Sequence, residues 1–112
     1  MATSYKILGQ AHLTTTSDTD IYTVPSATET IISTMIIANI ATATTTFNIA
    51  LRENGDALAN KHYIARNVPI ASEDSTTLTL GMALEATDVV TVAAPDDANL
   101  LSFNLFGAEI DV

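Results

Sequence analysis

The sequence predicts an all-β fold, a single antiparallel β-sandwich or jelly-roll-like domain of about eight strands that spans residues 1–112. Eighteen of the 112 residues are threonine, a β-branched residue that suits a half-buried pleated surface. Short alternating apolar segments recur between turn residues, which is typical of sandwiches and small barrels. No segment carries apolar residues at helical spacing, so we expect very little helix.

The predicted strands begin near the N-terminus and grow longer toward the middle of the chain. The first covers residues 5–10 and the second residues 20–24, which Pro25 ends because proline has no N–H to extend a ladder. A long run follows at residues 29–40, and it carries apolar residues at both odd and even positions. We therefore expect a central strand that is buried on both sides for part of its length.

The next segment, residues 44–53, alternates cleanly, and Phe47, Ile49 and Leu51 are expected to share one face. It ends in the dipeptide Asn54-Gly55, which is typical of a type I′ turn because both residues accept a positive φ. The sequence therefore predicts a tight hairpin at this dipeptide.

After this hairpin we expect one helical turn or a second bend at residues 57–60. Residues 61–68 then form a predicted strand that Pro69 closes. A further strand is expected at residues 76–80, where Gly81 kinks or terminates it.

The last two predicted strands cover residues 88–93 and 99–110. In the final strand Leu101, Phe103 and Leu105 alternate with more polar residues, so these three are expected to face the core.

Composition argues against several classes of function. Thirteen carboxylates against four Lys and Arg give a net charge of −9, so binding to nucleic acid is not expected. An acidic surface indicates solubility or a basic patch on a partner. There is no cysteine, and therefore no disulfide or thiolate metal site.

No membrane or export segment is expected. The longest apolar stretch, residues 35–38, is far shorter than the ~20 residues that span a bilayer. The first residues, 1–6, lack a basic start followed by an apolar block, so we expect no signal peptide and synthesis in a cytoplasm.

Histidine is the usual acid–base residue, and the chain has two, His12 and His62. No G-x-S-x-G element accompanies any serine, and an exposed or partner-facing role for both histidines is favoured over a catalytic one. The sequence therefore predicts a protein that is not an enzyme.

Two carboxylate pairs, Asp18/Asp20 and Asp96/Asp97, raise the question of a metal ion. The further oxygen ligands of a calcium loop are missing, and Asx-turns explain both pairs. The four glycines stand alone, so no phosphate-binding loop is present. We expect no metal and no cofactor.

The four cationic side chains are Lys6, Arg52, Lys61 and Arg66. Two of them lie close together around the aromatic residue Tyr63. Arginine and tyrosine are enriched at protein interfaces, so we expect these cations to form subunit contacts.

Five segments carry a resemblance to a known group of proteins. They are residues 5–10 (YKILGQ), 21–25 (IYTVP), 32–39 (ISTMIIAN), 59–65 (ANKHYIA) and 102–110 (SFNLFGAEI). With them the chain resembles small virion structural proteins of tailed bacteriophages over nearly its whole length. The resemblance implies a non-enzymatic component that is present in many copies in the virion and is made in the host cytoplasm, with no catalytic residues to transfer.

Within such a particle we expect a capsid decoration (cement) protein, a homotrimer that binds the major capsid protein at capsomer junctions. A tail, baseplate or fibre-attachment protein is the alternative, and a receptor- or carbohydrate-binding adhesin module is the third, disfavoured by the lack of Trp. Residues 1–12 could form an N-terminal arm or strand that contacts a neighbour. The residues expected at the subunit interface are Tyr5, Lys6, Ile7, Lys61, His62, Tyr63 and Arg66.

Overall fold

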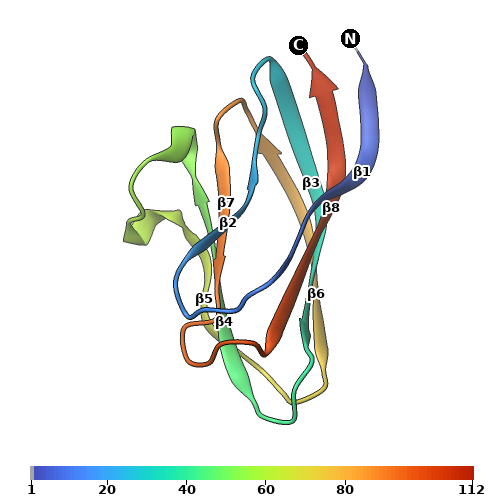
Figure 1. Ribbon diagram of the computed structural model, residues 1–112. Helices are drawn as coiled ribbons and strands as arrows, with labels where there is room; N and C mark the ends of the chain where they lie inside the picture. Colours follow the sequence, from blue (N-terminus) through green and yellow to red (C-terminus); the bar gives the residue numbers. More distant parts are fainter. Residues whose placement is uncertain (1) are drawn as a thin grey trace.

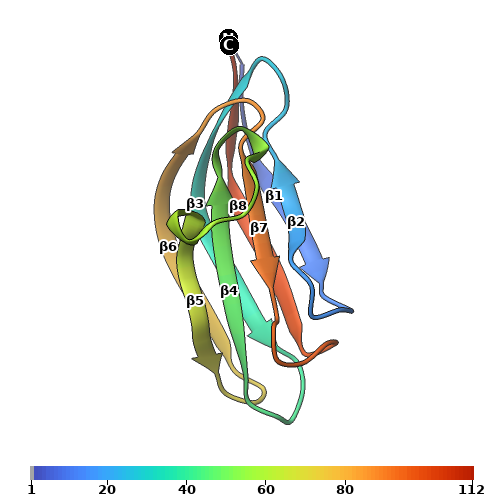
Figure 2. The ribbon, with the colours of Figure 1, turned by 90° about the vertical axis from the view of Figure 1, so that its left-hand side faces the viewer.

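The computed structural model describes residues 2–112 as two four-stranded antiparallel sheets packed face to face (Figures 1 and 2). The strands are β1 (Thr3–His12), β2 (Thr19–Thr23), β3 (Thr28–Asn39), β4 (Thr45–Arg52), β5 (Tyr63–Ile70), β6 (Ser75–Leu84), β7 (Val89–Ala93) and β8 (Leu101–Asp111). Two 3₁₀ turns, η1 (Glu53–Gly55) and η2 (Asn60–His62), lie between β4 and β5. The predicted all-β sandwich is confirmed.

The order of the strands identifies the sandwich as a jelly roll. Sheet A has the order β1-β8-β3-β6, and sheet B has the order β2-β7-β4-β5. The pairs β1·β8, β2·β7, β3·β6 and β4·β5 join the first half of the chain to the second half in reverse order. This pairing describes one long hairpin folded over on itself, which is the arrangement of a double-sheet jelly roll. Both chain ends therefore lie at the same end of the molecule (Figure 1).

The core fills the space between the two sheets and is built from aliphatic side chains and two phenylalanines. Leu101, Phe103 and Leu105 of β8 are fully buried, as their alternation predicted. Phe47 and Ile49 of β4 meet them from sheet B. The remaining fully buried apolar side chains of the cluster are Ile32, Met35, Ile37, Val90, Val92 and Ala94.

Strand β3 lies between β8 and β6 as expected, but the prediction that both its faces are buried is wrong. Its register against β8 shifts between Ile32 and Thr34, so Ser33 is an extra residue. The bulge reverses the alternation: Thr30 and Ile32 enter the core before it, and Met35 enters after it. Apolar residues at odd and even positions thus line the same inner face, and the outer face stays partly open.

The predicted tight hairpin at Asn54-Gly55 is also wrong, although both residues have the positive φ that it requires, 54° and 68°. β4 pairs with β5, but η1, η2 and an extended segment separate them. A contact from another part of the chain determines this path. The backbone N–H of Asn54 donates to Asp88 Oδ1 at 2.8 Å, and Thr87 Oγ1 donates to Asn54 Oδ1 at 2.6 Å.

Three other predicted boundaries shift. The helical turn expected at residues 57–60 is η2, at Asn60–His62. Pro69 does not close a strand but lies inside β5, which is tolerated because β5 is an edge strand. Gly81 does not end β6; it lies where the pairing with β3 is interrupted, between Thr79 and Met82. No part of residues 2–112 forms a helix that is long and apolar enough to cross a membrane.

Gly107 of β8 lies beside the bulge of β3, where the two backbones approach closely. A Cβ atom built on Gly107 would collide with the carbonyl oxygen of Ile31 and would also touch Leu8. Only glycine fits this contact without a shift of the strands.

We predict that Gly107→Ala lowers the free energy of unfolding by about 1–3 kcal/mol, because one of the two strands must move to admit the methyl group. Urea denaturation followed by circular dichroism measures this loss. Gly81→Ala is the matched control: nothing lies within 4 Å of its added Cβ, so the change should stay within about 1 kcal/mol. Equal effects of the two substitutions would contradict the role given to Gly107.

Candidate functional site

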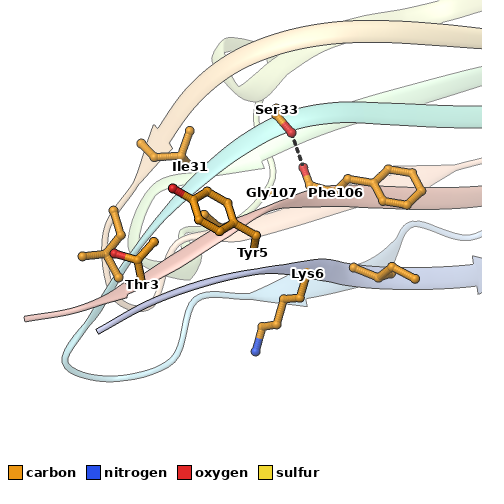
Figure 3. Close-up of a pocket in the computed structure, with 10 residues that line it drawn as sticks. Thr3, Tyr5, Lys6, Ile31, Ser33, Phe106 and Gly107 are labelled. Carbon is orange, nitrogen blue, oxygen red and sulfur yellow. Dashed lines mark hydrogen bonds between the residues drawn. The ribbon is translucent and has the colours of Figure 1, made fainter. Parts of the chain in front are cut away.

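An apolar hollow lies on the outer face of sheet A, close to the two chain ends, with a volume of about 610 Å³. Tyr5 and Ile31 lie over it from β1 and β3, and β8 forms its floor (Figure 3). Its lining residues are Thr3, Tyr5, Lys6, Ile7, Ile31, Ser33, Phe106, Gly107, Ala108 and Ile110. We refer to this surface as the apolar hollow.

Two bulges place these apolar side chains on the outside. The register of β1 against β8 shifts between Ile7 and Gly9, and that of β3 shifts at Ser33. Both shifts flank Phe106, so the alternation of β1 and β3 reverses at the same height of the sheet. At the bulge Ser33 Oγ donates to the carbonyl oxygen of Phe106 at 3.2 Å (Figure 3).

Beyond the bulges the outer face of β1 and β8 becomes polar. Gln10 Nε2 donates to Asn104 Oδ1 at 2.7 Å, and His12 Nε2 lies 3.0 Å from the carbonyl oxygen of Asn99. Ser102 also faces a shallow hollow there, of about 250 Å³. The outer face of sheet A is therefore divided into an apolar half near the chain ends and an amide- and hydroxyl-bearing half.

The apolar hollow concentrates exposed hydrophobic surface. Tyr5 is 85% exposed, Ile7 52% and Ile31 40%, and they account for three of the six exposed large hydrophobic residues among residues 2–112. They lie on strands separated only by β8. Contiguous exposed apolar surface of this kind marks a site of interaction with another molecule.

A polar cluster beneath the hollow connects the two sheets. Glu109 of β8 accepts from Lys6 Nζ at 2.5 Å and from the Tyr22 hydroxyl at 2.5 Å. The Tyr22 hydroxyl also lies 2.8 Å from Thr30 Oγ1. Because Tyr22 belongs to sheet B and the other three to sheet A, the cluster bridges the sandwich. In Figure 3 Lys6 points away from Tyr5, toward the other side of β1.

These contacts shift two pKa values. The hydrogen bond from Lys6, followed by that from Tyr22, holds the pKa of Glu109 below its ordinary value. Burial, followed by the hydrogen bond to Glu109, raises the pKa of Tyr22 to about 12. The folded protein thus favours an ionised Glu109 beside a neutral Tyr22.

The second predicted group of interface residues lies on η2 and β5. The Arg66 guanidinium lies 4.9 Å above the ring of Tyr63, and its Nη1 donates to Asn60 Oδ1 at 3.3 Å. Lys61 and Arg66 are both exposed. Within residues 2–112 neither of them forms an ion pair.

His62 is placed differently from its neighbours in sequence. Its side chain is buried, 6% exposed, and Nδ1 accepts the backbone N–H of Ala59 at 2.9 Å. Its Nε2 is the one buried side-chain atom without a hydrogen-bond partner in the part of the chain that the structure describes. His62 therefore shapes the turn before β5 and does not present its ring to the surface.

The structure does not bring the two predicted groups together. Tyr5, Lys6 and Ile7 lie on β1, an edge of sheet A, whereas residues 61–66 lie at β5, an edge of sheet B. Figure 2 shows β5 and β6 along one side of the sandwich and β1 and β2 along the other. Each group can therefore contact a different neighbour.

Asp20 of the first carboxylate pair and Asp96 of the second take part in internal contacts. Both oxygens of Asp20 lie 2.9 Å from Arg52 Nη2, and Thr91 Oγ1 donates to Asp20 Oδ1 at 2.8 Å. Asp96 accepts from Thr46 Oγ1 at 2.7 Å in the turn before β8. Among residues 2–112 no three His, Asp or Glu side chains gather as metal ligands would.

Sequence reasoning named Tyr5, Lys6 and Ile7 but missed the β3 and β8 side of the hollow. The signal was present in the adjacent apolar pairs Ile31-Ile32 and Leu105-Phe106. In a strand one member of such a pair must point outward unless the strand is covered on both faces.

Comparison with known proteins adds little to this description. No protein-family model and no curated protein matches the chain. Among solved structures, one of infectious bursal disease virus, Gt strain, aligns with a TM-score of 0.42 and 6% sequence identity. The alignment covers 96% of this chain and 31% of the viral chain. At this TM-score the match supports no conclusion, and the topology given above depends on the strand pairing alone.

We predict that Glu109→Gln destabilises the protein at pH 7 by about 1–3 kcal/mol, since it removes the charge that Lys6 and Tyr22 stabilise. The folded-state pKa of Glu109 is lowered, so its contribution is present above the unfolded-state pKa and is lost as pH falls through the folded-state pKa. The difference between wild type and variant should therefore shrink in acid. Urea unfolding from pH 7 to pH 3 measures it, with Glu73→Gln, at an exposed residue that lines neither hollow, as control. A difference between wild type and Glu109→Gln that is independent of pH contradicts the prediction.

We also predict that one of the three tyrosines titrates near pH 12, while Tyr22→Phe lacks this component. Because the pKa of Tyr22 is raised in the folded state, its contribution to stability is present below the ordinary tyrosine pKa of about 10 and is lost as pH rises through about 12. Absorbance at the tyrosinate band measures the titration. If the titration curve of Tyr22→Phe has the same shape as that of the wild type and only a smaller amplitude, the prediction is wrong.

Proposed function

We propose that this protein is a non-enzymatic structural component of a tailed-phage virion, and that it acts as a capsid decoration protein at capsomer junctions. The apolar hollow is the observation that carries the proposal. Tyr5, Ile7 and Ile31 are exposed on a regular, hydrogen-bonded sheet. A rigid, preformed apolar face can bind another protein surface at a low cost in conformational entropy.

The jelly-roll pairing of the strands agrees with this role, because viral capsid domains are among the proteins that use this architecture. The sequence resemblance to phage virion proteins directs the proposal to a phage particle. The acidic surface supports a partner with basic groups, here the major capsid protein.

The internal contacts of the charged side chains also support a structural role. Glu109, paired with Lys6 in the same sheet, accepts the hydroxyl of Tyr22 from the other sheet, and Arg52 holds Asp20 and the turn after β4. The carboxylate of Asp88 accepts the backbone N–H groups of Asn54 and Glu85. These side chains are engaged in holding strands and turns in place.

One observation favours a second candidate, a carbohydrate-binding module. The polar half of sheet A presents Gln10, His12, Ser102 and Asn104 around a shallow hollow, and lectin domains also use jelly rolls. The side chains there offer amide and hydroxyl groups that match sugar hydroxyls. A tail or baseplate position in the particle is the alternative to decoration of the capsid.

We expect quantitative mass spectrometry of purified particles to find this protein at a copy number comparable to that of the major capsid protein. The purified protein should also bind capsids that lack it. A copy number far below that of the capsid protein would assign it to the tail, and its absence from the particle would overturn the proposal. Binding to a glycan array, with no binding to capsids, would favour the carbohydrate-binding module.

A further inference from the structure

The edge of the sandwich at β5 carries two exposed cations and, between them in sequence, an exposed isoleucine. Lys61 and Arg66 are exposed, and Ile64 between them is 46% exposed. The other two cations of the chain are engaged, Lys6 with Glu109 and Arg52 with Asp20. We refer to Lys61, Ile64 and Arg66 as the basic edge.

The apolar hollow has an acidic rim on the side away from β1. Glu29 faces outward on β3, because the residues on either side of it are buried, and it pairs with Ile110 of the hollow. Glu29, Glu53 and Glu85 surround an adjoining hollow of about 330 Å³ that shares Ile31 and Ile110 with the first. We refer to these three glutamates as the acidic rim.

We propose that the apolar hollow and acidic rim of one copy bind the basic edge of a second copy. The two surfaces are complementary in hydrophobicity and in charge. Ile64 provides an apolar side chain for the hollow, and Lys61 and Arg66 provide the charges that its rim lacks. The inference rests on the proposed function, since it takes the hollow as a subunit interface, and it adds the partner and the residues that meet.

Charge selects this head-to-tail contact over a symmetric one. If two hollows faced each other, the acidic rims of two chains that each carry a charge of −9 would be brought together. Opposed like charges at an interface weaken association. Contact between the hollow and the basic edge instead places carboxylates opposite the two cations that have no ion pair within the chain described.

The positions of the two surfaces determine what such contacts build. The hollow lies on sheet A toward its β1 edge, and the basic edge lies at β5 of sheet B, on the other side of the sandwich (Figure 2). A contact between different surfaces of identical chains forms a closed ring when the rotation between neighbours allows it.

The test is a charge exchange followed by analytical ultracentrifugation of the purified full chain. We expect the wild type to sediment as an oligomer, and Glu29→Lys combined with Glu85→Lys to shift it to the 11.8 kDa monomer. Lys61→Glu combined with Arg66→Glu should have the same effect. A protein carrying all four changes should form the oligomer again, because the charges are opposite once more.

Controls separate this result from general effects of charge or folding. Asp18→Lys combined with Glu73→Lys changes the net charge as much as the rim substitutions do, on exposed residues that line neither hollow, and should leave the oligomer intact. Circular dichroism should show that every variant keeps its β-sheet. Ile64→Asp should also dissociate the oligomer.

A monomeric wild type, an oligomer indifferent to the basic-edge substitutions, or a fourfold variant that stays monomeric would each overturn the inference. These results are independent of the particle assay. A monomer that is abundant in virions would refute this contact and leave the proposed function in place. If the oligomer responds to the charge exchanges as expected but the protein is absent from virions, this contact stands and the proposed function is wrong.

Discussion

The two bulges beside β8 determine which side chains of sheet A enter the core and which face solvent. In an ideal strand every second residue points inward, and an extra residue exchanges the two sets. The shifts near Ile7 in β1 and at Ser33 in β3 occur on either side of Phe106. Both strands beside β8 therefore exchange their inward and outward positions at the same height of the sheet. The apolar hollow, the small residues of β8 in its floor and the close backbone approach that requires glycine at Gly107 all follow from this coincidence.

The same constraint explains why a charged cluster lies beneath an apolar surface. Where the outward positions of β1 and β8 carry apolar residues, the alternation directs Lys6 and Glu109 to the opposite side, toward sheet B. There Tyr22 supplies the hydroxyl that a partly buried carboxylate requires, and Glu109 is only 14% exposed. The cluster fixes the sheets relative to each other, and it keeps the end of the sandwich that carries the hollow rigid.

Charge is distributed unevenly over the molecule. Only four cations are present; two of them form ion pairs within the fold, and the other two lie at β5, an edge of the sheet opposite the one that carries the hollow. The excess of carboxylates keeps separate chains apart, while Glu29 and its neighbours leave one attractive orientation available.

Local properties of the sequence determined the fold class, the number of strands and the inward face of β8, because the period of two and the proline and threonine preferences act within one segment. Of the ten residues that line the hollow, the sequence pattern pointed to three, Tyr5, Lys6 and Ile7. Tertiary structure alone decided the bulge at Ser33, since an extra residue exists only relative to the register of the strand beside it. It likewise decided the path after Asn54, which depends on a hydrogen bond to Asp88 far along the chain. The hollow joins three strands that are distant in sequence, and so only folding could assemble it.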